Sequence, residues 1–247
     1  METQELHSVL RAQAELLLGE PGSARAPAQQ YARICDGLVQ AVPRARWATL
    51  ATRDRSGLRC LGATDERTPE LARVMADCGH GPCLDAIAAG SATEVVVDDV
   101  TAAGDRWPVF APAAARAGMR SVLCRAMAPG DRPIGELTVW SDEVGAFGDE
   151  RSRTIMAVLA AQAAVAVSGA QQAENLARAL RSRDVIGRAK GILMERFQLG
   201  DDGAFQLLVR SSQDLNMKLG EVATVLCREA EERAAPVPRA RSGPDSG

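Results

Sequence analysis

A long uninterrupted helical stretch constrains this chain more than any other feature. Residues 149–183 contain no proline and a single glycine, Gly169. Because proline and glycine are the residues that most disfavour a helix interior, the stretch predicts one helix of 35 residues. At the usual rise per residue, such a helix is roughly 50 Å long if it is continuous.

Within this stretch, small and apolar residues recur at alternating steps of four and three, a spacing typical of a coiled-coil seam. The seam predicts pairing with a second helix, in the same chain or in another subunit, and a homodimer through this helix is expected. The alternative is a helix that packs on its own domain. The seam residues are Ile155, Leu159, Gln162, Ala166, Gly169, Ala173, Leu176 and Leu180.

The bulk composition sets broad limits. The chain has 247 residues, of which 46% are hydrophobic, enough for a core in one large or two smaller domains. A net charge of -3 gives no global signature for nucleic acid or membrane, so any basic site must be local. The start of the chain lacks a basic segment followed by an apolar one, and no uninterrupted apolar run approaches about 18 residues. We therefore expect no signal peptide, no transmembrane helix and a cytoplasmic location.

The first part of the chain predicts strands alternating with helices. We expect helices at 2–18 and 31–42, with a turn cluster between them. After these come a hairpin around "DRSG", two helices, a strand, a further helix and a second hairpin around "PGDRP". This order predicts an α+β fold, an antiparallel sheet with helices on its faces. The segments are "RARWATLATRD", "GLRCLGAT", "PELARVMADCG", "CLDAIAAG", "ATEVVVDDV", "PVFAPAAARAG", "MRSVLCRAMA" and "PIGELTVWSD".

Three motifs in this part, "GPCLDA", "RWPVFAPAAARAGMRSVL" and "IGELTVWS", resemble GAF domains, which are small-molecule sensor modules. The resemblance covers residues 30–169. It implies a six-stranded antiparallel sheet with a ligand pocket on one face, lined by residues 78–85, 98–110 and 119–121. The ligand-binding residues that it implies are Cys78, His80, Cys83, Asp98, Trp107 and Met119.

Other roles for these residues stay open. Cys78, His80 and Cys83 are compatible with part of a metal site, but their spacing matches no standard zinc pattern. The chain has six cysteines and no CxxC, too few for a disulfide scaffold, so redox sensing or plain structural packing are the alternatives. Trp107 can line a pocket or fill the core. Asp98 and Asp99 lack the pattern of a phosphate-accepting receiver, which favours solvated or capping carboxylates.

No motif identifies a metal centre or a cofactor. Some enzymes of the GAF fold reduce methionine sulfoxide through paired cysteines, and no motif for that chemistry is present. We therefore expect no catalytic activity.

The stretch "VIGRAKGILMERF", residues 185–197, forms an amphipathic pattern on a helical wheel. Beside its apolar face lies a strip of low bulk, made by Gly187, Lys190, Gly191 and Met194, which suits close approach of another helix or of a phosphodiester backbone. Between residues 178 and 218 there are eight basic and five acidic residues, an excess that a solvated helix face also explains. The apolar face comprises Val185, Ile186, Ala189, Ile192, Leu193 and Phe197.

The segment 182–232, with "AKGILM" followed by "AFQLLVRSSQDLNMKLGEVA", resembles the ANTAR domain, an RNA-binding antitermination module. The resemblance implies three helices that bind paired stem-loops in leader transcripts and so prevent a terminator hairpin. Arg188 and Lys190 would neutralise phosphates. Ser212 and Asn216 would hydrogen-bond loop bases, although capping of a turn is their alternative role. The implied RNA-binding residues are Arg188, Lys190, Gly191, Met194, Arg196, Ser212, Asn216 and Lys218.

Packing expectations follow for this segment. Its aromatic residues, Phe197 and Phe205, are predicted to be core, so base stacking on rings is not expected. The further core residues expected here are Ala189, Ala204, Leu208, Leu219, Val222 and Ala223.

Together these patterns predict a signal-responsive transcription antiterminator that resembles GAF and ANTAR regulators of the actinobacterial type. Its sensor would respond to a small molecule or a redox signal, and its C-terminal domain would bind RNA. The alternative is a DNA-binding regulator, since three short helices with a basic face also suit a helix-turn-helix. The expected parts are a helix and linker (1–29), a GAF-like domain (30–169), a linker helix (170–181), an all-α ANTAR-like domain (182–233) and a disordered tail (234–247).

Overall fold

The computed structural model describes residues 27–54, 57–91 and 93–234. The chain divides into two compact units, residues 1–171 and residues 172–247. The predicted helix at 2–18, most of the following linker and almost all of the predicted tail lie outside the described residues.

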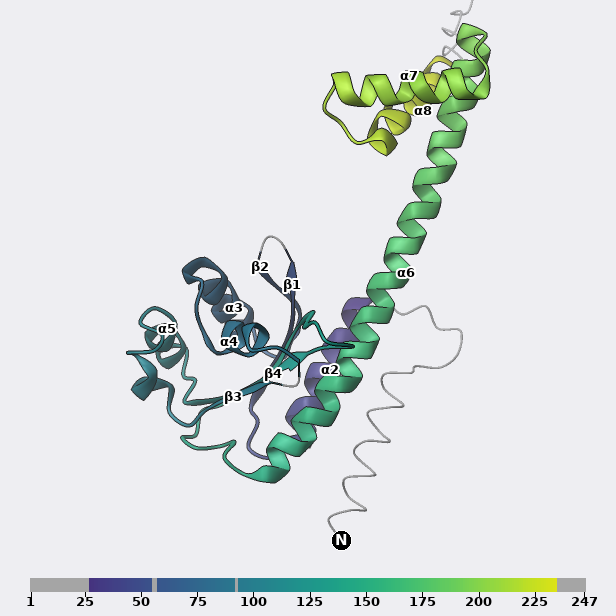
Figure 1. Cartoon of the computed structure of the whole chain (residues 1–247). Coiled ribbons are helices and arrows are strands. Elements are labelled where there is room, and N and C mark those ends of the chain that lie inside the picture. The colour runs from purple at the N-terminus through teal and green to yellow at the C-terminus, as the bar shows by residue number, and fades with distance from the viewer. Residues whose placement is uncertain (1–26, 55–56, 92, 235–247) are drawn as a thin grey trace, which may run out of the picture. The chain divides into compact units, whose positions relative to one another are not determined.

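The described part of the N-terminal unit contains one sheet and several helices (Figure 1). All of the predicted segments that fall on described residues form the expected type of element. In chain order the elements are α2 (Pro27–Ala41), β1 (Trp47–Asp54), β2 (Gly57–Ala63), α3 (Arg67–Cys78), α4 (Pro82–Ala88), β3 (Glu94–Val97), the 3-10 helix η1 (Val100–Ala103), α5 (Phe110–Arg116), β4 (Ser121–Met127), β5 (Gly135–Ser141) and the first part of α6 (Glu150–Phe197).

The sheet is antiparallel, as predicted, with the strand order β2-β1-β5-β4-β3. Both predicted hairpins are present, because β1 pairs with β2 and β4 pairs with β5. The expectation of six strands was wrong for the described residues, which form five. After β3 the Asp99 carboxylate accepts a hydrogen bond from the Thr101 amide and starts η1, so the chain turns away from the sheet there.

The two faces of the sheet carry separate hydrophobic cores. On one face α2 and the start of α6 cover strand residues such as Leu50, Leu123 and Leu137. On the other face α3, α4 and α5 cover residues such as Cys124 and Trp140. The N-terminal unit therefore has three layers, with the sheet in the middle, as the predicted fold class requires.

The first part of α6 is a core helix of the N-terminal unit. Ile155 and Leu159 from the predicted seam are buried in the core on the α2 side, so this part of the helix packs on its own domain. The later seam residues Leu176 and Leu180 are 64% and 54% exposed. Among the described helices, α6 contains an 18-residue stretch long and apolar enough to cross a membrane. The core packing of its first part accounts for much of this apolarity.

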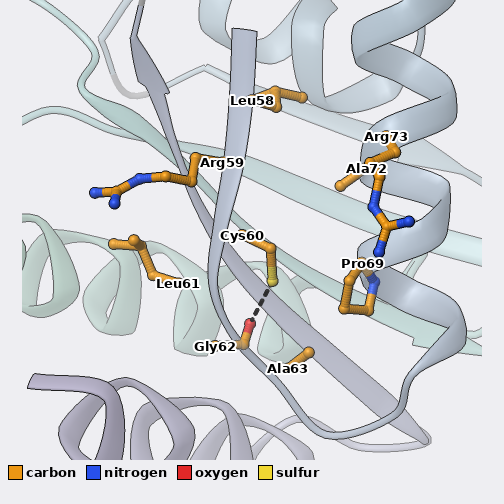
Figure 2. A pocket seen from close by; sticks show the side chains of 9 residues that line it. All are labelled: Leu58, Arg59, Cys60, Leu61, Gly62, Ala63, Pro69, Ala72 and Arg73. Atoms are coloured by element: carbon orange, nitrogen blue, oxygen red, sulfur yellow. Dashed lines mark hydrogen bonds between the residues drawn. The ribbon is translucent and has the colours of Figure 1, made fainter. Parts of the chain in front are cut away.

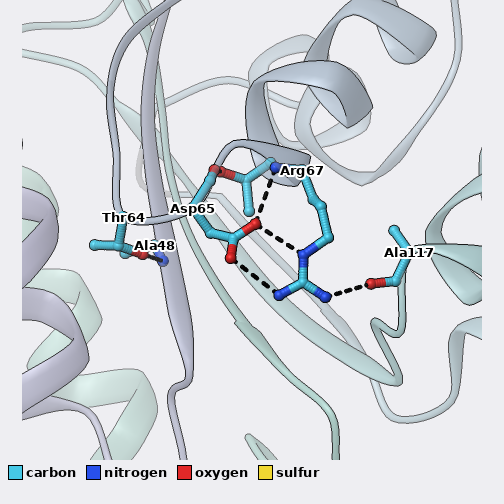
Figure 3. Close-up of polar contacts among 6 residues, drawn as sticks. Ala48, Thr64, Asp65, Arg67 and Ala117 are labelled. Carbon is cyan, nitrogen blue, oxygen red and sulfur yellow. Dashed lines mark hydrogen bonds and ion pairs between the residues drawn. The ribbon is translucent and has the colours of Figure 1, made fainter.

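A polar cluster joins several elements of the N-terminal unit (Figure 3). The Arg67 guanidinium donates two hydrogen bonds to the Asp65 carboxylate, at 2.8 and 3.0 Å, and a third to the carbonyl of Ala117, at 2.9 Å. The same guanidinium lies 4.4 Å from the ring centroid of Trp47 on β1. Because one side chain contacts β1 and the end of α5, it fixes the start of α3 between them.

The C-terminal unit consists of the end of α6, α7 (Asp201–Asp214) and α8 (Leu219–Ala234). The prediction of three short helices was wrong for the first, because α6 continues without a break through residues 182–197. No proline interrupts it, and Gly187 and Gly191 are tolerated inside it. The predicted core residues Ala189, Ala204, Leu208, Val222 and Ala223 are buried, whereas Leu219 is half-buried.

Candidate functional site

The two glycines of the low-bulk strip predicted on the end of α6 are exposed. A Cβ placed on Gly187 or Gly191 would have no atom of the described chain within 4 Å, beyond the helix's own backbone. Packing between the three helices of this unit therefore does not require either glycine. Two exposed glycines on a helix surface leave the backbone accessible to an external partner.

A hollow of about 550 Å³ lies on one side of this strip. Lys190 is at its edge, with Nζ 2.5 Å from Oδ1 of Asp201 and 5.9 Å from the ring centroid of Phe205. Phe205 also lines the hollow and is 37% exposed, so its prediction as core was wrong. An aromatic ring beside cationic side chains is a surface on which a nucleic-acid base can stack. The lining residues are Arg183, Asp184, Ile186, Gly187, Arg188, Lys190 and Phe205.

A second hollow, of about 660 Å³, lies between α6 and α8. Arg188 lines both hollows, and its guanidinium lies 3.6 Å from the carboxylate of Glu231 in an exposed pair. Five basic and two acidic side chains line the two hollows, and three of the basic ones pair with carboxylates outside the lining, Lys190 with Asp201, Arg188 with Glu231 and Arg233 with Glu229. The second hollow is lined by Arg188, Gly191, Ile192, Glu195, Arg196, Ala230 and Arg233.

The other predicted RNA-binding residues have different surroundings. Met194 is partly buried and packs against the core of the C-terminal unit. Ser212 donates a hydrogen bond from its hydroxyl to the carbonyl of Met217, at 2.6 Å, and so stabilises the turn between α7 and α8. Asn216 has a left-handed backbone (φ 50°) in this turn and is exposed, as is Lys218. Ser212, Asn216 and Lys218 do not line either hollow.

Phe197, at the end of α6, was also predicted to be core. It is the last residue of α6, is 54% exposed and does not belong to the hydrophobic core of the C-terminal unit, so this prediction was wrong. Wheel periodicity places a residue on a face of the helix, but it does not show where the covering helices stop.

In the N-terminal unit the predicted ligand residues do not form one cavity. Trp107 and Met119 are buried in the core beneath α5, and the Trp107 indole donates a hydrogen bond to Asp85, at 3.2 Å. Asp98 is exposed. Cys78 Sγ lies 3.6 Å from Nδ1 of His80, whereas the Cys83 thiol is buried against Thr138 of β5. The Cys-x-His-x-x-Cys fragment therefore does not converge on one point.

A hollow of about 530 Å³ opens between β2 and α3 (Figure 2). Cys60 on β2 and Arg73 on α3 face each other across it, while Arg59 points to the opposite side of the strand. Burial raises the pKa of the Cys60 thiol, which donates a hydrogen bond to the carbonyl of Gly62 at 3.4 Å. The six predicted ligand residues do not line this hollow.

The two units match two known families. The GAF domain model matches residues 24–168, which is more than half of the chain, and the ANTAR domain model matches residues 174–226. The chain belongs to the GAF domain family and carries an ANTAR domain. The sheet with its flanking helices is thus the GAF domain, and the strip on α6 with the first hollow lies in the ANTAR domain, while the second hollow also includes Ala230 and Arg233 just beyond the matched residues. These matches make the protein a regulator with a sensor domain.

Solved structures agree on the fold of the GAF domain. One is a domain described as part of a two-component sensor histidine kinase from Sinorhizobium meliloti 1021, with 16% identity and a TM-score of 0.50 over 63% of this chain and 99% of that one. Another is free methionine-R-sulfoxide reductase from Neisseria meningitidis, with 21% identity and a TM-score of 0.50 over 68% and 91%. Among curated proteins none matches the chain. At these identities the similarity shows the fold alone.

Proposed function

We propose that this protein is a signal-responsive transcription antiterminator that binds stem-loop RNA through its ANTAR domain. The observation that carries the proposal is the hollow beside Gly187, where Arg183, Arg188, Lys190 and the exposed ring of Phe205 meet on one surface. Cationic side chains neutralise phosphates, and an exposed ring offers a stacking surface to an unpaired loop base. Binding of this kind stabilises the paired stem-loops of the leader transcript, so the terminator hairpin forms less often.

The GAF domain supplies the signal input in this proposal. The hollow between β2 and α3 is lined by apolar residues together with Arg59, Cys60 and Arg73, and the guanidinium of Arg73 suits a small molecule with an acidic group. The protein acts by binding rather than by catalysis, in the cytoplasm where transcripts are made. The reductase similarity is limited to the fold, and function has to be argued from the site.

We also propose that two copies pair through α6. In the N-terminal unit Val165 is 67% exposed, on the side of α6 opposite the core face. In the C-terminal unit Leu176 and Leu180, four residues apart, are exposed and lie on one side of the helix. Exposed apolar residues at this spacing are typical of a surface that a second helix covers.

A binding assay at several salt concentrations tests the RNA proposal. The full chain is titrated into a leader RNA with two stem-loops and, separately, into duplex DNA of equal length. We expect tighter binding to the RNA and weakening as salt rises. Tighter binding to the duplex DNA would support a DNA-binding regulator instead.

A matched pair of variants assigns the binding to the hollow. Arg188→Ala should weaken RNA binding and reduce the salt slope by roughly 0.7 to 0.9. Arg178→Ala is the control, because Arg178 is also exposed, lies on the same helix and is also paired with a glutamate, Glu174, at 3.0 Å. An equal loss of RNA affinity in the two variants would show that the hollow beside Gly187 is not the RNA-binding surface.

Sedimentation velocity tests the pairing through α6. Changing Leu176 and Leu180 together to lysine should shift the chain from dimer to monomer, because like charges then face each other in the seam. Val225→Lys on α8, another exposed apolar position, is the control. A monomeric wild-type chain at the concentrations used for RNA binding would contradict the dimer.

A further inference from the structure

Three ligand-type side chains converge in the buried centre of the GAF domain. Cys83 comes from the first turn of α4, Cys124 from β4 and Glu136 from β5, and all three are almost completely buried. Their sulfur and carboxylate atoms all lie within 4.8 Å of one another. Of the three residues in the predicted metal fragment, Cys78, His80 and Cys83, only Cys83 belongs to this group.

The sheet register explains why the strand residues meet. Cys124 lies directly opposite Thr138 on the neighbouring strand, so the two side chains share a face of the sheet. Glu136 is two residues from Thr138 and projects from that same face. Helix α4 packs on this face and brings Cys83 onto the pair, with Cys83 Sγ at 3.4 Å from Thr138 Oγ1.

The spacing of these atoms fits a tetrahedral cation. For zinc, the usual metal–sulfur and metal–oxygen distances place a sulfur and an oxygen ligand about 3.5 Å apart. Cys124 Sγ lies 3.6 Å from Glu136 Oε2. This sulfur–oxygen pair is therefore at the separation that a bound ion would require, and Cys83 Sγ lies within 4.8 Å of both atoms.

We propose that Cys83, Cys124 and Glu136 form a binding site for a thiophilic divalent cation of the zinc class. Two thiolates balance the charge of such an ion, and the carboxyl group supplies an oxygen as third ligand. Thr138 donates a hydrogen bond to Glu136 and orients it, as hydrogen-bond donors beside metal ligands do. Three protein ligands leave one tetrahedral position for a further donor.

Burial raises the pKa of both thiols and raises that of the Glu136 carboxyl to about 7, so an ion has to displace their protons when it binds. A carboxyl group in an apolar core reduces stability relative to an apolar residue unless it has a specific partner. A cation would add a charged partner to the hydrogen bonds that Thr138 and Cys124 donate to this carboxyl group, and the proposal does not depend on RNA binding.

The first test is metal content. Because the three side chains are covered, the ion has to enter while the chain folds, so the full chain is produced in zinc-supplemented medium and purified without chelator. We expect stoichiometric zinc by elemental mass spectrometry. Refolding with Co2+ should give the visible bands of a tetrahedral ion and a thiolate charge-transfer band.

Variants assign the ion to these residues. Cys124→Ser and Glu136→Gln should abolish metal binding, and Thr138→Val should lower the metal affinity by about 10- to 100-fold. Cys35→Ser is the matched control, since Cys35 is also a fully buried thiol of the GAF domain but lies in the core on the other face of the sheet. It should retain the metal.

Three results would overturn the proposal. One is a folded wild-type chain without zinc and without cobalt–thiolate bands. Another is an equal loss of metal in Cys35→Ser, which would indicate a general effect on folding. The third is a disulfide between Cys83 and Cys124, detected by mass after alkylation. The wild-type cobalt spectrum decides the question even where a variant does not fold.

Discussion

The ammonium group of Lys190 lies 2.5 Å from the carboxylate of Asp201, at the point where α7 starts beside the end of α6. The Lys190 side chain is 21% exposed and that of Asp201 is 69% exposed, so a phosphate has to reach the ammonium group beside an exposed carboxylate. In the proposed RNA complex the phosphate and the Asp201 carboxylate compete for one cation. Two variants of this pair therefore have opposite effects.

Asp201→Asn should strengthen RNA binding by a few-fold, because it removes the competing anion and leaves the cation in place. Lys190→Ala should weaken RNA binding and reduce the salt slope by roughly 0.7 to 0.9. Both substitutions break the same ion pair, so a purely structural role for Lys190 predicts that both weaken binding equally. Filter binding at several salt concentrations, with melting temperatures of both variants, separates the two roles.

Gly191→Ala should stabilise the ANTAR domain by about 1 kcal/mol, since alanine favours a helix interior and the position is open. Gly191→Leu should also fold, but its side chain would cover the strip and reduce RNA affinity. Thermal unfolding and RNA titration of both variants measure this. Gly169→Ala, at another exposed position of α6, is the control and should leave RNA binding unchanged. Unfolding of Gly191→Leu would show that the strip is needed for packing.

The sequence predicted most of the fold because each element carries a local signal. Gly79, in a left-handed conformation, ends α3 where the pattern predicted, and the "DRSG" segment separates two strands that pair. Ala189 and Leu208 are buried, as the helical periodicity of the apolar residues predicted. These features depend on residues close together in the chain.

The site features that the sequence did not predict depend on residues far apart in the chain. Phe205 was predicted as core from its type, but its exposure depends on where α7 packs against α6. The convergence of Cys83, Cys124 and Glu136 needs the strand register and the position of α4, and neither leaves a spacing signal in the sequence.

Asp65 should make a pH-dependent contribution to stability. Hydrogen bonds from the Arg67 side chain and amide lower the pKa of Asp65 below its ordinary value of 3.8. A carboxyl group with a lowered pKa in the folded state stabilises the protein above its unfolded value and loses that effect as pH falls through the folded value. Asp65→Asn should therefore lower the melting temperature at neutral pH, and the difference from wild type should shrink below pH 3.8.

A double-mutant cycle controls for unrelated effects of this substitution. In an Arg67→Gln background the Asp65→Asn change should have a smaller effect on the melting temperature, because the guanidinium is absent and only the backbone amide of residue 67 still donates to this side chain. An unchanged difference across pH, or an undiminished effect in the Arg67→Gln background, would assign the contribution of Asp65 to other contacts.

Phe205→Leu tests whether the exposed ring contributes to RNA binding. Leucine keeps an apolar side chain at this position, but it removes the flat surface beside Lys190 on which a base can stack. Loss of one stacked base costs about 1–3 kcal/mol of binding free energy. Phe197→Leu is the control, because Phe197 is also an exposed phenylalanine of the ANTAR domain but does not line the hollow of Phe205. Titrations of both variants against the two-stem-loop RNA should show weakening for Phe205→Leu alone, together with an unchanged salt slope, since no phosphate contact is lost. If both variants bind the RNA as tightly as the wild type, stacking on the Phe205 ring is excluded and the basic side chains alone account for the affinity of this surface.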